Sequence, residues 1–316
     1  MHENTKRTSK KKVHINNRGF VLKSFQFRMA SATDIISIAD HFSYYLAVIN
    51  IGVGIFGNLI NLAVFGALKL FRSNQCVFYF IIESIVDTCQ LSTLFVVSAV
   101  PVIYGYDPGN SNLVWCKLKN MLPQTFRLLS TSMVCFAALD QFLSTNPRLS
   151  IRQMSTLSLS YYLTAIAVCL WNIHSIPYAV FYEINSQKTC VMTNTALTQY
   201  YSFFYYPILH GFLPILLSAI CSLLAYRNVR NIIRRQVNIE RRRLDRQLTA
   251  MVFVRVVLFV IFLLPYTIYR IYGLNNKFTR ANLYPYAIDR LLFSITAALV
   301  NFNFSVEFSN LRVWLF

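Results

Sequence analysis

Charged and amide side chains are scarce in this chain, and some of them interrupt long apolar runs. One almost wholly apolar run stops at Asp140-Gln141-Phe142. A carboxylate at such a place has two interpretations: it is the solvated end of a buried helix, or it belongs to a switch that forms and breaks a polar contact. Glu83 and Arg127 also lie inside apolar runs. A charge is costly there and is by default a functional candidate, so each residue is a ligand contact, a member of an internal ion pair, or a charge that the bundle tolerates without a role.

The patterns of common enzymes and cofactor sites are missing from the sequence. The stretch GVGIFG, with Gly52, Gly54 and Gly57, has the spacing of dinucleotide-binding glycines, but such a site needs a preceding strand and a downstream acid. Here the glycines lie in an apolar run, where small residues let helices pack closely. The five histidines are scattered without metal-ligand spacing, and no nucleophile is paired with a base. We therefore expect neither an enzyme nor a metal centre.

Apolar runs of helix length make up most of the chain. It has 316 residues, of which 55% are apolar or aromatic and 13% are charged, whereas a soluble domain has roughly 25% charged residues. Because a helix needs roughly 20 apolar residues to cross a bilayer, we predict an all-α membrane protein, a bundle of seven transmembrane helices. The predicted spans are residues 43–69, 77–104, 116–143, 156–181, 199–226, 247–273 and 284–308.

Lysine and arginine indicate the orientation of these spans. The loops after the first, third and fifth spans are basic, and the last of them holds eight arginines from Arg227 to Arg246. By the positive-inside rule these loops are cytoplasmic, which places the N-terminus outside and the C-terminus in the cytoplasm. We expect the basic face to lie against anionic membrane lipids and acidic partners. Nucleic acid explains this charge poorly.

The N-terminal segment opposes the positive-inside rule. Residues 1–28 hold eight basic residues and one acid, without the apolar core of a signal peptide. We expect this segment to be disordered, or translation to start at Met29. The predicted organisation is an N-terminal segment over 1–42, a seven-helix domain over 43–308 and a short tail over 309–316.

Two of the seven cysteines are expected on the outer side. Cys116 lies at the start of the third span and Cys190 in the second outer loop, whereas the others lie within spans, where a thiol behaves as a small apolar group. Because the outer side is oxidising, we predict a disulfide between these two residues. Asp140 follows Cys116 by 24 residues, which is about 36 Å of helix. It is therefore expected at the cytoplasmic mouth.

The order of these features over about residues 40–310 resembles the rhodopsin-like G-protein-coupled receptors. No single motif is specific, but their order and spacing together are. The residues that carry the resemblance are Gly57-Asn58, Asp87, Cys116, Asp140-Gln141-Phe142, Trp171, Cys190, Pro214, and Phe259 six residues before Pro265. The resemblance implies a multi-pass receptor of the plasma membrane that binds an extracellular ligand and activates a heterotrimeric G protein.

The resemblance also implies roles for individual residues. It implies a mid-membrane polar cluster, which either holds a sodium ion or is a water-mediated network between helices. The cluster residues are Asn58, Asp87, Ser130, Asn301 and Asn303. The residues implied for coupling to the G protein are Asp140, Gln141, Phe142, Arg227 and Arg230. Those implied for the activation switch are Phe259, Pro265, Pro214 and Trp171.

The sequence departs from the family at three motifs. The arginine of Asp-Arg-Tyr is replaced by Gln141, and the tryptophan before the helix-six proline by Leu263; "NFNFSVEF" lacks the proline and tyrosine of Asn-Pro-x-x-Tyr. Because glutamine is neutral, arginines of the neighbouring loops, such as Arg148 and Arg152, become the candidate partners of Asp140. We interpret the chain as a divergent receptor, or as a homologue that has lost G-protein coupling.

A transporter or channel-like protein is the alternative from another class. It would show repeated halves, or broken helices with paired charges at the midplane. The sequence shows no such repeat, so the receptor interpretation is favoured.

The expected ligand is a peptide or a small organic molecule. Amine receptors of the family have an aspartate where this chain has Pro123, and retinal-binding members have a helix-seven lysine, which residues 284–308 lack. The stretch QYYSFFYYP either anchors a helix end at the membrane interface or contributes to the ligand site. The candidate pocket residues are Gln124, Arg127, Tyr205, Arg270 and Asp289.

Overall fold

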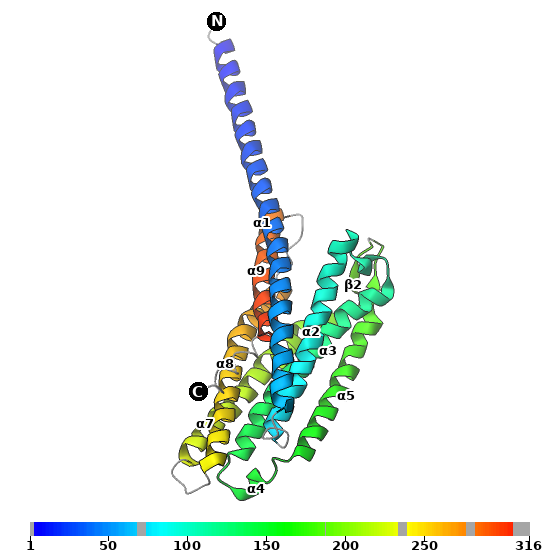
Figure 1. Cartoon of the computed structure of the whole chain (residues 1–316). Helices are drawn as coiled ribbons and strands as arrows, with labels where there is room; N and C mark the ends of the chain where they lie inside the picture. The colour runs from blue at the N-terminus through cyan, green and yellow to red at the C-terminus, as the bar shows by residue number, and fades with distance from the viewer. Residues whose placement is uncertain (1–2, 68–73, 187, 233–238, 276–281, 306–316) are drawn as a thin grey trace.

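Seven long apolar helices form the bundle (Figure 1). The computed structural model describes residues 3–67, 74–186, 188–232, 239–275 and 282–305. Within this part of the chain, the helices able to cross a membrane are Ser31–Ala67, Gln75–Pro101, Leu113–Ser144, Leu157–Phe181, Thr195–Arg230, Arg246–Gly273 and Leu283–Asn303. The prediction of seven transmembrane helices is therefore confirmed. The predicted tail, 309–316, lies outside the described residues.

The spans correspond to the long helices of the structure, with short elements between them. The long helices are α1 (Glu3–Ala67), α2 (Gln75–Tyr104), α3 (Leu113–Ser144), α5 (Leu157–Phe181), α7 (Leu213–Ile232), α8 (Ile239–Asn275) and α9 (Leu283–Asn303). The short elements are the 3-10 turn η1 (Pro108–Asn110), α4 (Leu149–Arg152), α6 (Thr195–Tyr200) and the strands β1 (Tyr182–Ile184) and β2 (Cys190–Met192). The fifth span joins α6, a π-helical stretch η2 (Tyr201–Phe212) and α7.

Polar side chains fix where several helices begin. Four helices begin with a side chain that accepts hydrogen bonds from backbone N–H groups of the first turn. These residues are Asn74 for α2, Asn112 for α3, Thr156 for α5 and Asn194 for α6. These contacts satisfy donors that have no partner within the helix. At its other end α2 stops at Gly105, which has a φ of 72°. Only glycine adopts this left-handed conformation without steric cost.

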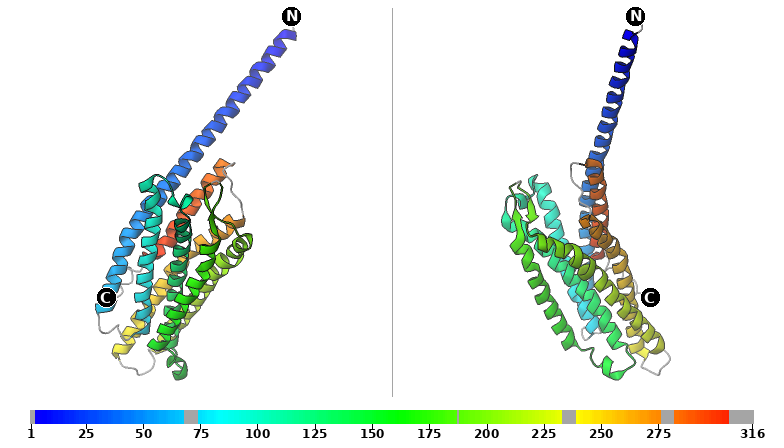
Figure 2. Two further views of the ribbon diagram at one scale, coloured as in Figure 1. Left: turned by 90° about the vertical axis from the view of Figure 1, so that its right-hand side faces the viewer. Right: turned by 180° about the vertical axis from the view of Figure 1, so that it is seen from behind.

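The first helix is much longer than a bilayer requires. Its N-terminal part extends beyond the bundle, at the same end as the β1–β2 hairpin (Figures 1 and 2). The sequence predicted that residues 1–28 are disordered or lie upstream of the true start at Met29, and the structure is helical from Glu3. This stretch contains no proline and a single glycine, so little in it interrupts a helix. The start of translation at Met29 remains a prediction.

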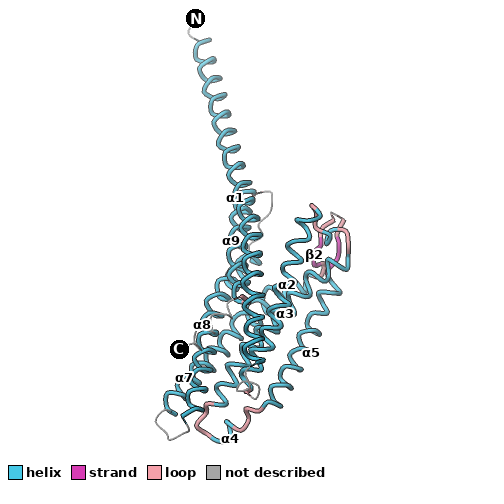
Figure 3. The backbone as a smooth tube through the Cα atoms, in the orientation of Figure 1, coloured by secondary structure: helices cyan, strands magenta, loops and turns pink. Residues whose placement is uncertain are grey.

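Helix α3 lies at the centre of the packing. It contacts α2, α5, α7 and α8, while α1 packs between α2 and α9. The main apolar core includes Met133 and Ala138 of α3, Phe80 of α2 and Phe259 of α8. Figure 3 shows that strands occur only as a small hairpin at one end of the otherwise helical described chain.

The π-helical stretch η2 turns aromatic side chains into the bundle. Tyr201, Tyr205 and His210 are buried, and Pro207 lies within the same stretch. A π-helix is rare and often occurs at functional sites. Gly211 allows η2 to approach α8 closely, because a Cβ atom there would lie 2.5 Å from Cγ2 of Thr267.

Candidate ligand cavity and polar core

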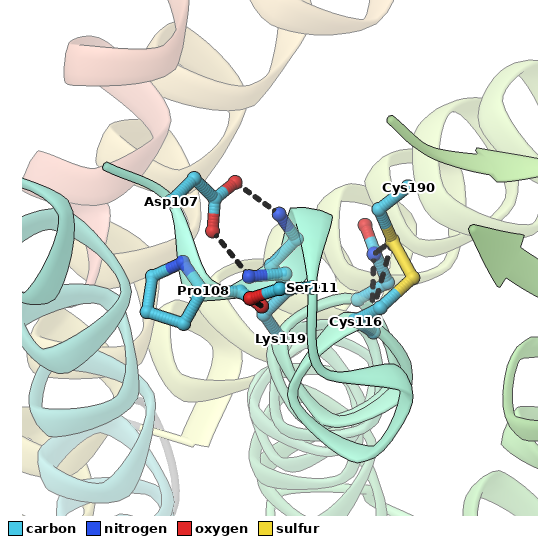
Figure 4. Close-up of polar contacts among 8 residues, drawn as sticks. Asp107, Pro108, Ser111, Cys116, Lys119 and Cys190 are labelled. Carbon is cyan, nitrogen blue, oxygen red and sulfur yellow. Dashed lines mark hydrogen bonds and ion pairs between the residues drawn. A yellow bond between two sulfur atoms is a disulfide. The ribbon is translucent and has the colours of Figure 1, made fainter. Parts of the chain in front are cut away.

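A disulfide ties the hairpin to the start of α3. Cys116 and Cys190 are bonded, with their Cα atoms 5.7 Å apart, as predicted (Figure 4). Cys190 is paired with Ile184 in the antiparallel hairpin, and β1 directly follows α5. The disulfide therefore fixes the hairpin relative to α3. We call this end of the bundle the disulfide end, and the opposite end, where α4 lies, the Asp140 end.

An ion pair joins the loop before α3 to the first turns of that helix. One oxygen of Asp107 accepts a hydrogen bond from the backbone N–H of Gly109 at 2.8 Å, and the other pairs with Nζ of Lys119 (Figure 4). Burial alone would raise the pKa of Asp107. The hydrogen bonds from Lys119 and Gly109 and the charge of Lys119 outweigh burial, so the pKa of Asp107 lies below its ordinary value.

A cavity of about 410 Å³ lies between α3, η2 and α8 at the disulfide end. Tyr182 and Met192 of the hairpin line part of it. Of the predicted pocket residues, Gln124, Arg127 and Arg270 line this cavity. The prediction therefore placed three side chains from two helices around one cavity, although their role in ligand binding remains a prediction.

The other two predicted pocket residues lie elsewhere. Tyr205 is fully buried among the rings of Tyr201, His174 and His210, outside the cavity lining. It points into the aromatic packing because η2 turns it inward. Asp289 lines a separate cavity of about 230 Å³, which Arg270 also lines.

Two arginines of the cavity contact tyrosines. Nη1 of Arg127 donates to the hydroxyl of Tyr266 at 3.2 Å, and its guanidinium lies 5.4 Å from the centre of that ring. Nη2 of Arg270 donates to the hydroxyl of Tyr206 at 2.7 Å, with the guanidinium 4.2 Å from the ring centre. Such cation–π contacts contribute about 0.5–2 kcal/mol, which is less than the several kcal/mol that burying an ion costs.

Neither arginine has a carboxylate partner among the described residues. The ion pairs formed in this part of the chain involve neither Arg127 nor Arg270, and the Nε atom of each is buried without a hydrogen-bond partner. Asp289 is engaged by Tyr269, whose hydroxyl donates to its Oδ1 atom at 2.7 Å. The cavity is therefore electropositive and polar, with tyrosine rings as its walls.

A buried ion pair connects three helices near the middle of the bundle. Arg255 of α8 donates from Nε and Nη2 to Oε1 of Glu83 at 2.8 and 2.5 Å, and from Nη1 to Oδ1 of Asn303 at 2.6 Å. The side chains of Arg255 and Glu83 are 2% and 0% exposed. Glu83 had no partner predicted from the sequence, and Arg255 was not among the candidate residues. The available signal was a second charge, of opposite sign, inside another predicted span.

Part of the predicted polar cluster adjoins this ion pair. Asn58, Asp87, Ser130 and Asn303 are buried, and Asp87 lies near Glu83, Arg255 and Ser130. The amide of Asn58 donates to the backbone oxygen of Phe304 at 3.2 Å. Asn301 is partly buried and lines a third cavity, next to α1 and α2. The structure therefore places Asp87 and Asn303 next to Arg255, and Ser130 next to Asp87. Asn58 contacts the backbone beside Asn303, and the role of these residues as a cluster remains a prediction.

Comparison with protein families identifies the chain. The family "7 transmembrane receptor (rhodopsin family)" matches residues 57–303. The chain belongs to this family. The matched segment contains the disulfide, the arginine-lined cavity and the Arg255 ion pair. A comparison with curated proteins found no match.

The sodium ion implied for receptors of this family fits the polar cluster only in part. Both carboxylate oxygens of Asp87 and the hydroxyl of Ser130 are buried without a hydrogen-bond partner, and oxygen atoms are the donors that hard cations take. The guanidinium of Arg255, however, already supplies a positive charge here and occupies the side-chain oxygen of Asn303. Sodium binding to this receptor remains a prediction.

The Asp140-Gln141-Phe142 triplet of the receptor makes neutral contacts. Asp140 is only 6% exposed and accepts a hydrogen bond from Ser155 at 2.6 Å. It is therefore not a solvated helix end, and it forms no ion pair with the described arginines; Arg148 and Arg152 are exposed. Of the expected partners, Arg148 and Arg152 do not pair with Asp140, because the loop after α4 brings Ser155 onto the carboxylate instead.

The glutamine of the triplet joins α3 to α8. Oε1 of Gln141 accepts a hydrogen bond from Thr249 at 3.1 Å, and Gln141 is 3% exposed. Phe142 packs against the main apolar core, and Arg227 and Arg230 are exposed near the end of α7. The roles of these residues in coupling remain predictions.

Two of the predicted switch residues of the receptor contact α3: Trp171 through Ser132, and Pro214 through Cys135, whose Sγ atom donates to the carbonyl of Pro214 at 3.6 Å. Phe259 is buried in the main core, and Pro265 lies inside α8. The carbonyl of Pro214 accepts a bond from Ser218 at 2.6 Å, and Nε1 of Trp171 donates to Ser132 of α3 at 2.8 Å. Their role in switching is not tested by these contacts.

Proposed function

We propose that this receptor binds an extracellular organic ligand in the cavity between α3, η2 and α8 and activates a heterotrimeric G protein by a movement of α8. The observation that carries the proposal is that Arg127 of α3 and Arg270 of α8 line the same cavity. A ligand that contacts both side chains binds more tightly to one position of α8 relative to α3 than to another. This difference in affinity shifts the equilibrium between the two positions of the helix.

The contacts of α8 support its role as the moving element. Towards the disulfide end it presents Tyr266 and Arg270 to the cavity. Near its middle Arg255 is bonded to α2 and α9, and towards the Asp140 end Thr249 is bonded to α3. A displacement of α8 therefore changes contacts at all three levels, which links the ligand cavity to the end proposed to meet the G protein.

The proposed orientation places the disulfide end outside the cell, in the plasma membrane. The positive-inside rule supports it, because Arg148, Arg152, Arg227 and Arg230 are all exposed on segments adjoining the loops of the Asp140 end. These side chains are proposed to face anionic lipids. The hairpin and disulfide then lie over the cavity, on the side from which an extracellular ligand arrives.

The neutral Gln141–Thr249 contact favours a second candidate function, a receptor homologue without G-protein coupling. Expression of the full chain with a ligand library and a G-protein dissociation readout separates the two. We expect ligand-dependent dissociation for at least one G-protein class. Ligand binding without dissociation of any class would support the uncoupled homologue. A transport current through the expressed protein would instead support the transporter alternative.

A further inference from the structure

The chemistry of the cavity limits the kind of ligand it can hold. Among the described residues that line it, Lys119, Arg127 and Arg270 are basic and none is acidic. Lys119 already pairs with Asp107, but the two arginines contact only neutral tyrosine hydroxyls and rings. Contacts with tyrosine rings recover only part of the hydration that a guanidinium loses on burial. The cavity therefore contains two arginine side chains without a counter-ion among the described residues.

The geometry of the guanidinium groups favours an oxyanion. Arginine binds carboxylate and phosphate groups through paired N–H donors. The Nε atoms of Arg127 and Arg270 are both buried without a hydrogen-bond partner, while one Nη atom of each donates to a tyrosine. Each side chain thus keeps at least one buried donor for an incoming anion.

The third cavity, which Asn301 also lines, supplies a place for an apolar group. It has a volume of about 330 Å³ and lies between α1, α2 and α9. Its lining includes Leu46, Leu94 and Val97, and it shares Arg127 and Tyr266 with the first cavity. Both volumes are in the range of small-molecule sites, roughly 300–1,000 Å³. Arg127 therefore lies where a polar and an apolar cavity meet.

We propose that the ligand is an amphipathic organic acid. Its carboxylate, sulfate or phosphate group binds Arg127 and Arg270, and its hydrocarbon part occupies the cavity next to Leu94. The proposal rests on the proposed function in taking this cavity as the ligand site, but it does not require that the receptor couples to a G protein. A cationic ligand is disfavoured, since it would meet two buried arginines.

The test measures the thermal stability of the purified full chain in a non-ionic detergent. The probes are decanoate, decyl phosphate, decanol and decylamine, which have alkyl chains of nine or ten carbons and different head groups. We expect the two anions to raise the melting temperature in a saturable manner and the alcohol and the amine to have little effect. Decanoate against decyl phosphate shows whether a carboxylate or a phosphate is preferred.

Variants connect the effect to the two arginines. Arg127→Gln and Arg270→Gln are each expected to weaken binding of the anions by about tenfold or more. Arg290→Gln is the matched control, because Arg290 is 47% exposed, pairs with Asp40 and does not line the cavity. It should bind the anions as the unaltered chain does.

A further variant tests the apolar cavity without changing any charge. Leu94→Trp fills the space next to Arg127, so decanoate binding should weaken while that of the short acid hexanoate stays the same. If an arginine variant fails to fold, Leu94→Trp still tests whether the ligand occupies this cavity.

Three results would overturn the proposal: equal stabilisation by decylamine or decanol, equal responses of the arginine variants and the unaltered chain, or no stabilisation by any of the anions. Because the melting temperature needs no G protein, a failure of coupling leaves this test intact and the two proposals fail separately.

Discussion

At the scale of single residues, Arg255 carries a charge that the bundle balances internally. Its guanidinium bonds Glu83 and Asn303, so one side chain connects α8 to α2 and α9. A buried pair contributes little net stability, because desolvation offsets the attraction between the charges. Removing one partner is different, since it leaves a buried charge uncompensated. The residue at position 83 therefore limits which residues are tolerated at position 255, and the reverse also holds.

This restriction predicts a non-additive pair of substitutions. Glu83→Leu and Arg255→Met alone should each destabilise the receptor by about 3–5 kcal/mol, whereas the double variant should recover most of that loss. Unfolding of the purified protein in detergent measures the effect, with the exposed Glu183→Gln as a control. Losses that simply add in the double variant would show that the two side chains do not form a pair.

Asp107 predicts a pH dependence at the disulfide end. Its pKa is lowered in the folded receptor by Lys119 and Gly109 against the effect of burial. A lowered folded-state pKa stabilises the fold above the ordinary carboxyl pKa of about 4, and this contribution is lost as the pH falls through the lower folded value.

Melting temperatures measured from neutral to acidic pH test this expectation. The unaltered receptor should lose more stability on acidification than Asp107→Asn, which cannot titrate at this position. Parallel pH profiles for the two proteins would contradict the role given to the Asp107–Lys119 pair.

At the scale of elements, the sequence predicted the helices better than their contacts. Span length and hydropathy depend on the local chain, so all seven spans appear at their predicted places, although α9 ends at Asn303 and not at 308. The hairpin was missed, because strands of three residues leave no periodic pattern. The partner of Glu83 was missed because Arg255 is 172 residues away along the chain, and only the fold of the bundle brings the two side chains together.

The same distinction holds for the candidate site. Gln124, Arg127 and Arg270 were found because charged and polar residues stand out within apolar spans. Tyr205 lies outside the lining of the larger cavity, because η2 turns it into the aromatic packing, and Asp289 lines the smaller cavity that Arg270 also lines. Both placements depend on tertiary packing, and the role of each residue in ligand binding remains a prediction. Sequence patterns therefore indicate which residues are costly to bury, and the tertiary fold determines which of these residues contact each other.

The contact between α3 and α8 at the Asp140 end predicts a change in basal activity. The hydrogen bond from Thr249 to Gln141 is neutral, and such a bond contributes about 0.5–1.5 kcal/mol. Thr249→Val should therefore raise basal G-protein activation by about two- to tenfold, if loss of this bond favours the active position of α8. Nucleotide exchange on the G protein without ligand measures it.

Two further variants complete that experiment. Thr249→Ser keeps the hydroxyl and should behave as the unaltered receptor does. Gln141→Arg restores the family's charge next to Asp140 and should strengthen ligand-dependent coupling. Unchanged basal activity in Thr249→Val would show that this bond does not hold α8 in its resting position.

At the scale of the whole molecule, charge is arranged in three layers along the bundle. Arginines without carboxylate partners line the cavity at the disulfide end, a balanced pair lies in the middle, and exposed arginines adjoin the loops of the Asp140 end. Helix α8 carries Arg270 in the first layer and Arg255 in the second. A ligand anion would neutralise the arginines at the disulfide end and leave the balanced pair in the middle unchanged. The two layers therefore respond to different ions.

The middle layer predicts how the receptor responds to sodium. Arg255 already places a cation beside Glu83 and Asp87, so we infer that a sodium ion binds there more weakly than in a cluster without arginine. The melting temperature should then be the same in sodium chloride and in choline chloride at equal ionic strength.

Arg255→Met leaves two buried carboxyl groups without that charge, and sodium should stabilise this variant more than choline does. Glu83→Leu/Arg255→Met keeps only Asp87 and separates the effect of the arginine from that of the extra acid. If sodium stabilises the unaltered receptor as strongly as it does Arg255→Met, then Arg255 does not weaken the binding of the ion.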